Sequence, residues 1–327
     1  MTNTPYSDLT PDLILNAIES LDFLCSGSLL ALNSYENRVY QVGIEDSQPL
    51  IAKFYRPGRW SSEAILEEHA FALELQEHEL PVIAPLRLGP QQATLHEFQN
   101  FRFALFPRKG GRPLELDNLE QLEWMGRFIG RLHAIGACKP FLHRTRLDVQ
   151  TYGHTPYRFL VENNFIPAEL RQNYCMTVDV ILQQIEQSFQ QMGELSYLRL
   201  HGDCHAGNVL WRPEGPHIVD LDDCLMGPAV QDIWMLLSGN EHDVKKQLLH
   251  IMDGYEEFYD FNRRELHLVE ALRSLRMIHY SAWLARRWDD PTFPMNFPWF
   301  NTPRYWQEQL QHLREQAVLL SEANEKF

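Results

Sequence analysis

Basic residues are scarce in this sequence. Lys and Arg number 29 against 44 Asp and Glu, so the formal net charge of the 327-residue chain is −15 at pH 7. A surface with this balance of charge repels the phosphate backbone of DNA and RNA. We therefore expect no nucleic-acid partner.

The sequence also lacks the features of a secreted or membrane-inserted protein. The first segment carries Asp8 and Asp12 where a signal peptide has basic residues, and no apolar run reaches the roughly 18 residues that span a bilayer. The five cysteines show no closely paired zinc spacing, and their odd number argues against a complete disulfide framework. These absences predict a cytoplasmic protein without membrane insertion.

The hydrophobic periodicity divides the chain into two parts. Before residue 107, β-rich runs are predicted at 38–42, 50–55, 93–98 and 101–106, with helices at 8–21 and 61–78. After the Gly110-Gly111 turn the apolar spacing is mainly helical, at 119–133, 169–191, 229–237, 244–258, 265–287 and 305–323. We expect an α+β fold with a small β-rich N-terminal lobe (1–107) and a larger, mainly helical C-terminal lobe (108–327), separated by a cleft.

Two segments concentrate the chemically active side chains. Residues 201–208 read HGDCHAGN and residues 218–223 read IVDLDD. Asp203 and Asn208 stand five residues apart in a glycine-bearing loop, and Asp220 follows twelve residues later at the end of an apolar run. Each of these residues alone is an ordinary turn former. Their complete order and spacing are those that kinases use.

Phosphoryl transfer depends on positioned charge more than on covalent help from the protein. Asp203 would orient the attacking hydroxyl and accept its proton. The Asn208 amide oxygen and the Asp220 carboxylate are the hard oxygen ligands that Mg²⁺ prefers. The sequence therefore predicts the use of ATP and Mg²⁺, with Asp203 and Asp220 as catalytic residues and with Asn208 and Asp220 as metal ligands.

The N-terminal part contains residues suited to hold the nucleotide. Lys53 lies in the apolar run IAKF, where its ammonium group could contact the α- and β-phosphates, and a Glu on the next helix could fix its position. We prefer Glu68 for this role, because its distance from the turn at 80–82 suits the pairing, and keep Glu67 in reserve. The alternative is an edge-strand Lys and a helix Glu, both solvated.

The loop at 33–38, of sequence NSYENR, lies where a hairpin would cover the phosphates. It contains no glycine, but the hydroxyl of Ser34 and backbone N–H groups could still bind phosphate oxygens. Adenine would lie near Phe106, at the junction of the two lobes. Core packing explains Phe106 equally well.

The pattern H-G-D-x-x-x-x-N followed by V-D at a strand end resembles the aminoglycoside phosphotransferase and choline kinase group, whose architecture protein kinases share. Segments 33–40, 53–57, 200–208, 219–223 and 296–299 are similar to bacterial stress response kinases of this kind. The resemblance implies a two-lobed protein-kinase-like fold and a serine/threonine protein kinase. It also implies Asp203 as proton acceptor, Asn208 and Asp220 at Mg²⁺, and Ser34 at the ATP phosphates.

The chain departs from the protein-kinase pattern in two places. Gly202 stands where protein kinases have Arg, and Leu221-Asp222 follows Asp220 in place of Phe-Gly. The resemblance further implies that Asp232 braces the catalytic loop, although by itself it is simply an acid in the first turn of a helix. We expect protein substrates with Ser or Thr acceptors, autophosphorylation, and a monomer.

Three other functions fit parts of the sequence. A kinase for a small alcohol would use the same chemistry with a different acceptor. A metallohydrolase could bind zinc through the His, Cys and Asp residues of the two segments, and a non-catalytic nucleotide-binding module would need only the fold. The helix predicted at 265–287 carries five further candidates: Arg276, Tyr280, Trp283, Arg286 and Arg287. These side chains could line a pocket for the acceptor. Alternatively, the aromatic residues pack in the core and the arginines are solvated.

Overall fold

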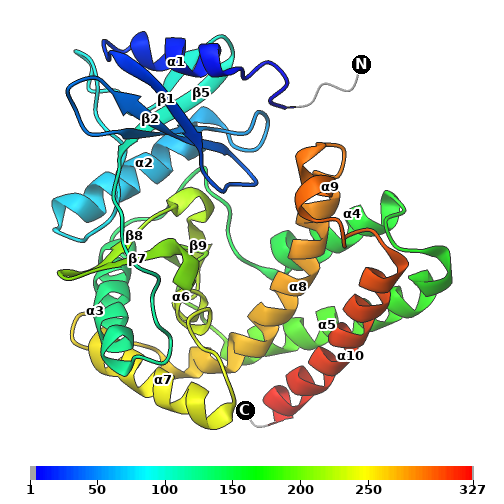
Figure 1. Cartoon of the computed structure of the whole chain (residues 1–327). Helices are drawn as coiled ribbons and strands as arrows, with labels where there is room; N and C mark the ends of the chain where they lie inside the picture. Colours follow the sequence, from blue (N-terminus) through cyan, green and yellow to red (C-terminus); the bar gives the residue numbers. More distant parts are fainter. Residues whose placement is uncertain (1–4, 326–327) are drawn as a thin grey trace.

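The computed structural model describes residues 5–325, which form a small N-terminal lobe and a larger C-terminal lobe (Figure 1). A five-stranded antiparallel sheet forms the N-terminal lobe, in the order β1-β2-β3-β5-β4. Its strands are β1 (Cys25–Ala31), β2 (Arg38–Ile44), β3 (Leu50–Phe54), β4 (His96–Phe98) and β5 (Phe101–Pro107). The α+β prediction is confirmed.

One helix covers each face of this sheet. Helix α1 (Pro11–Glu19) packs on the cluster that contains Ala52 and Phe54, whereas α2 (Ser62–Glu77) packs through Ile65 on the opposite face. Side chains alternate between faces along a strand. Lys53 therefore points away from α1, toward α2 and the cleft.

Side-chain oxygens cap the first turns of both helices, which begin at Pro11 and Ser62 where the sequence predicted starts at 8 and 61. Thr10 Oγ1 accepts from the N–H of Leu13, and Ser61 Oγ accepts from the N–H of Ala64, each at 3.2 Å. Side-chain oxygens of this kind satisfy amide groups that have no partner within the first turn of a helix. The cap at Ser61 fixes the start of α2, the helix that carries Glu67 and Glu68.

The C-terminal lobe is mainly helical. Its helices are α3 (Leu119–Gly136), α4 (Thr155–Glu162), α5 (Ala168–Met192), α6 (Val230–Trp234), α7 (Glu241–Tyr255), α8 (Val269–Ala285), α9 (Thr292–Asn296) and α10 (Pro303–Glu325). One continuous apolar core unites them. Within residues 5–325, no helix combines the length and apolar character needed to cross a membrane.

Two small antiparallel sheets interrupt these helices and carry the polar loops. Strand β6 (Leu198–Leu200) pairs with β9 (Leu225–Gly227), and β7 (Val209–Arg212) pairs with β8 (Gly215–Ile218). The first pairing brings residue 200 close to residue 225, and the second brings residue 209 beside residue 218. The segments 201–208 and 219–224 therefore lie next to each other.

The sequence did not predict every element. We expected no regular structure at 150–162, where a π-helical turn (Gln150–His154) leads into α4, and none at α9. The helix predicted at 265–287 begins with a 3-10 segment, Arg263–Leu268, before α8. Both α8 and the turn at 150–154 contribute to the wall of the cleft.

Candidate active site

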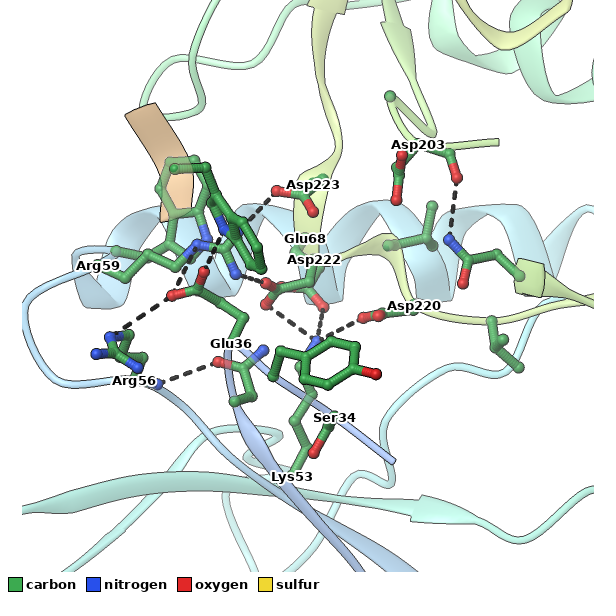
Figure 2. A pocket seen from close by; sticks show the side chains of 18 of the residues that line it. Ser34, Glu36, Lys53, Arg56, Arg59, Glu68, Asp203, Asp220, Asp222 and Asp223 are labelled. Atoms are coloured by element: carbon green, nitrogen blue, oxygen red, sulfur yellow. Dashed lines mark hydrogen bonds and ion pairs between the residues drawn. The ribbon is translucent and has the colours of Figure 1, made fainter. Parts of the chain in front are cut away.

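A cleft of about 1340 Å³ lies between the lobes. Its lining includes every residue that the sequence singled out for the site: Ser34, Lys53, Glu68, Phe106, Asp203, Asn208 and Asp220. Figure 2 shows Lys53 and Glu68 converging from the small lobe on Asp220 and Asp222, with Asp203 farther along the cleft. Residues more than 160 positions apart in the chain meet here.

The loop after β6 is held by one buried carboxylate. Asp232, in the first turn of α6, accepts from the backbone N–H groups of His201 and Gly202, both at 2.8 Å. His133 Nε2 lies 3.2 Å from the same carboxylate. Carboxylates that accept several amide hydrogen bonds are strong, directional anchors. Asp232 therefore fixes the backbone immediately before Asp203.

Gly202 is required by the path of this loop. Its φ angle is +85°, in the left-handed region, and a Cβ atom there would lie 2.3 Å from the carbonyl oxygen of Asp223. A side chain would therefore clash with the backbone of the 219–224 turn and strain the loop. The departure from the protein-kinase Arg at this position follows from the close approach of the two loops.

Asp203 lies at the wall of the cleft with two basic partners. Its Oδ1 accepts from Arg276 Nη1 at 2.9 Å, and its Oδ2 lies 3.3 Å from His205 Nε2. Burial alone would raise the pKa of Asp203, but His205 and Arg276 together hold this pKa below its ordinary value. The side chain is therefore a carboxylate at neutral pH, as a proton acceptor must be.

Asn208 is oriented by the loop that contains it. Its Nδ2 donates to the backbone carbonyl of Asp203 at 3.0 Å, so its amide oxygen is the atom left to act as a ligand. The N–H of Val219 donates to the Asn208 carbonyl, also at 3.0 Å. This second bond places Asn208 beside the strand end that leads to Asp220.

Asp220 turns its carboxylate into the cleft. Its φ angle of +61° bends the chain sharply after Val219, and its side chain is 57% exposed. Asp220 Oδ1 accepts from Lys53 Nζ at 3.1 Å. A non-glycine residue in this conformation is uncommon and tends to mark a functional site.

Lys53 is the centre of a buried cluster of charges. Its Nζ lies 3.3 Å from Glu68 Oε1 and 3.0 Å from Asp222 Oδ1. Burial alone would lower the pKa of Lys53, but Asp222, Glu68 and Asp220 raise it well above its ordinary value. The ammonium group is therefore charged and fixed in place, as a phosphate-binding group should be.

The neighbouring acids Glu67 and Glu68 have different partners. Glu68 contacts Lys53, whereas both carboxylate oxygens of Glu67 accept backbone N–H groups of the large lobe, from Leu142, His143 and Arg144. The preference for Glu68 as the partner of Lys53 agrees with this geometry. Glu67 instead fastens α2 to residues 142–144.

Sequence reasoning missed two arginines of the site, Arg59 and Arg144, and it missed the pairing of Asp222 with Lys53. Asp222 is buried between Lys53 and Arg59, and Arg59 also pairs with Asp223. Arg144 donates to the backbone carbonyls of Leu221 and Cys224, and so stabilises the turn at 219–224. The acidic run at 222–223 was the only available signal, because nothing in the sequence connects Arg59 or Arg144 to it.

Two predicted nucleotide contacts also line the cleft. The Ser34 hydroxyl lies within the β1–β2 loop, where it accepts from the N–H of Val39 at 3.2 Å and lies 3.4 Å from the carbonyl of Leu32. Phe106 lies at the end of β5, and its ring meets that of His69 edge-on at 6.4 Å. Both residues are placed where the sequence predicted them, at the loop and at the junction of the lobes.

Helix α8 forms the wall opposite the small lobe. Arg276, Tyr280, Trp283, Arg286 and Arg287 all line the cleft. The rings of Tyr280 and Trp283 stack at 5.7 Å, and those of Tyr152 and His279, which the sequence analysis missed, stack at 4.3 Å. Arg287 is largely buried, unlike the solvated arginine of the alternative interpretation.

His201 and His205 are both engaged within the polypeptide. His201 Nε2 bonds to the Val219 carbonyl at 3.0 Å, and His205 Nδ1 accepts from the N–H of Gly207. Among residues 5–325, no group of three or more His, Cys, Asp or Glu side chains is arranged to hold a metal ion. The zinc arrangement of the metallohydrolase alternative is therefore not formed by the described side chains.

Comparison with known proteins gives a consistent result. The model of the phosphotransferase enzyme family matches residues 28–292. Stress response kinase A of Escherichia coli (strain K12) is 44% identical over 317 residues, which cover 97% of this chain and 95% of that protein. The serine/threonine protein kinase RdoA of Salmonella typhimurium (strain LT2) is 43% identical over the same coverage.

Solved structures share the fold at low sequence identity. Amicoumacin kinase hAmiN, solved in complex with AMP-PNP, Ca²⁺ and Ami, superimposes with a TM-score of 0.73 at 20% identity, covering 96% of this chain and 93% of that one. A microcompartment-associated aminopropanol kinase gives a TM-score of 0.67 at 17% identity, covering 94% and 96%. The two-lobed architecture is thus common to this chain and to these enzymes.

Proposed function

The chain belongs to the phosphotransferase enzyme family and is an ATP-dependent kinase, and we propose that its acceptors are serine and threonine hydroxyls of proteins. Phosphoryl transfer itself is supported by the convergence of Asp203, Asn208 and Asp220 with Lys53 in one cleft, and the protein acceptors are supported by the names of the relatives. These side chains supply the charge and the positioning that phosphoryl transfer needs.

We assign the proton acceptor role to Asp203. Its carboxylate is ionised and faces the wall formed by α8, on which an acceptor hydroxyl would approach. Orienting that hydroxyl and accepting its proton as the bond to phosphorus forms is general-base catalysis. Asp232 anchors the backbone immediately before Asp203, and so supports the loop that carries this carboxylate.

We assign the nucleotide to the small-lobe side of the cleft. Lys53, fixed by Glu68, would contact its phosphates, and the β1–β2 loop with Ser34 would cover them. Phe106 would pack against the adenine at the junction of the lobes. This arrangement would give the triphosphate one fixed cation, Lys53, beside carboxylates whose charge a bound metal ion would offset.

The donor set fits Mg²⁺ as the accompanying ion. The Asn208 amide oxygen and the exposed Asp220 carboxylate are hard oxygen ligands, and Mg²⁺ is usually bound by one or two such groups together with substrate phosphates. When bound, the ion would neutralise charge on the phosphates. Asn208 and Asp220 would hold it beside Lys53.

Protein acceptors are supported by the relatives named as stress response and serine/threonine protein kinases, which match almost the entire chain. Two structural neighbours are named as kinases of amicoumacin and of aminopropanol, but at 20% identity or less they share the fold alone. We propose autophosphorylation as an accompanying activity, a monomeric enzyme, a role in bacterial stress responses and a cytoplasmic location.

Transfer of labelled phosphate would test the acceptor class. The purified protein is incubated with radiolabelled ATP and Mg²⁺, alone and with an unfractionated protein mixture, beside Asp203→Asn as a matched inactive control. We expect label on Ser and Thr of protein only with the wild type. Transfer that strictly requires an added small alcohol would instead assign the chain to small-molecule kinases.

A further inference from the structure

The β1–β2 loop is fastened to the opposite lobe through Glu36. Glu36 Oε2 accepts from the indole N–H of Trp283 at 2.7 Å, and the same oxygen forms an ion pair with Arg287 Nε at 2.5 Å. Trp283 is near the C-terminal end of α8, and Arg287 follows that helix. A loop of the small lobe is thus bonded directly to the wall of the large lobe.

The residues beside Glu36 make contacts with the same region. The ring of Tyr35 lies 4.9 Å from that of Phe297, and Arg38 Nη2 donates to Thr292 Oγ1 at 2.7 Å. Arg56, on the segment after β3, donates to Asp290 at 2.9 Å. The loop is therefore held at several points to residues 283–297.

Glu36 is the shared acid of this contact. Besides Arg287, its carboxylate lies 3.7 Å from Arg56 Nε and 3.8 Å from Arg59 Nε (Figure 2). The Glu36 side chain is only 12% exposed. Charges screened so weakly by water interact strongly, and removing one partner of a buried ion pair is costly. Without this carboxylate, Arg56 would keep Asp290 and Arg59 would keep Asp222 and Asp223, whereas Arg287 would lose the acid with which it pairs across the lobes.

We propose that Glu36 is a positioning residue that closes the phosphate-covering loop onto α8 and thereby sets the rate at which nucleotide leaves the cleft. The inference rests on the proposed function, in which the loop containing Ser34 covers the ATP phosphates. Opening the loop requires the bonds from Glu36 to Trp283 and Arg287 to break. Opening of such covering loops is rate-limiting for product release in many enzymes.

Dissociation of a fluorescent ADP, mant-ADP, tests this in the full-length protein with Mg²⁺. Stopped-flow chase experiments compare the wild type with Glu36→Ala, Glu36→Gln and a control, Glu45→Ala, an exposed residue beyond the end of β2. We expect roughly tenfold faster dissociation for Glu36→Ala, equivalent to about 1.4 kcal/mol, because the loop loses its charged hydrogen bond to Trp283 and its ion pair with Arg287. Glu36→Gln should give a smaller increase, and Glu45→Ala none.

Two outcomes separate the inference from the function on which it rests. An unchanged dissociation rate in a folded Glu36→Ala protein overturns the closure proposal alone. A wild type that binds no mant-ADP overturns the proposed nucleotide site and the closure together.

A second variant keeps the test decisive if Glu36→Ala does not fold. Trp283→Phe removes the indole N–H but keeps a ring against Phe293 and Phe297. We expect it to speed dissociation as well. Its effect combined with Glu36→Gln should be smaller than the sum of the single effects, because both changes break the same contact. Strictly additive effects would contradict the proposal.

Discussion

The guanidinium group of Arg276 lies 2.9 Å from the carboxylate of Asp203, across the cleft from the small lobe. Arg276 comes from α8, 73 positions later in the chain, and its side chain is 45% exposed. The acceptor wall therefore presents a cation beside the proposed base. An acceptor hydroxyl that reaches Asp203 must share this carboxylate with Arg276.

The first prediction concerns the base. Asp203→Asn keeps the shape of the side chain but cannot accept a proton, so we expect kcat to fall by roughly 10²–10⁴-fold. Affinity for ATP should change little, since Asp203 acts on the acceptor. Phosphate transfer and ATP binding are measured on the same preparation. Turnover close to that of the wild type would exclude Asp203 as the base.

The second prediction separates the metal ligand from the base. Asp220→Ala removes a carboxylate proposed to hold Mg²⁺ beside the phosphates, so it should weaken binding of Mg·ATP by about tenfold or more, in addition to abolishing transfer. Binding of ATP in the presence of EDTA should be nearly the same in the variant and the wild type. Equal affinity for Mg·ATP in the two proteins would contradict the assignment.

The third prediction uses the adjacent acids of α2 as a matched pair. Glu68→Gln weakens the hold on Lys53, so we expect kcat/KM for ATP to fall by roughly tenfold or more. Glu67→Gln loses charge at a contact with three backbone amides, so it should lower the melting temperature and leave KM for ATP nearly unchanged. The opposite assignment of effects would show that Glu67 is the partner of Lys53.

The fourth prediction concerns stability against pH. Burial raises the pKa of Glu265 to about 7, despite the hydrogen bond from the N–H of Val230. Between its ordinary pKa and about 7, Glu265 is protonated in the folded state but ionised in the unfolded state. The stability contributed by the protonated group is therefore fully present at low pH and is lost as the pH rises through about 7.

Glu265→Gln should remove this part of the pH dependence, because an amide stays neutral. We expect the variant to be more stable than the wild type at pH 8, by on the order of 1–3 kcal/mol, and to show a flatter profile between pH 5 and 8. Urea denaturation at several pH values measures this, with the exposed Glu194→Gln as control. Parallel profiles for Glu265→Gln and the wild type would refute it.

Much of the fold was predictable because it depends on local rules. The caps at Thr10 and Ser61 and the long apolar spacing of α3, α5 and α10 are determined by nearby residues. The strand β7 (Val209–Arg212) was missed because four residues are too few to show a clear alternation of apolar and polar side chains. The π-helical turn at 150–154 was missed because its hydrogen bonds follow no common periodicity.

The chemical motif was predictable for a different reason. Asp203, Asn208 and Asp220 lie close together in the chain, so their spacing alone restricts how they can meet. Glu36 and Arg59 are far in sequence from Arg287 and Asp222, and only the folded chain shows these partners. The sequence could identify the reacting groups but not the contacts that hold the lobes around them.

The hydrogen bonds between Glu67 and residues 142–144 limit how the activity of this enzyme can be regulated. In protein kinases, the position of the helix that pairs with the active-site lysine controls activity. In this chain, rotating α2 to withdraw Glu68 would also break the hydrogen bonds of Glu67 with three backbone N–H groups of the large lobe. These bonds hold α2 in position, so regulation of this enzyme has to act through segments that can move without α2.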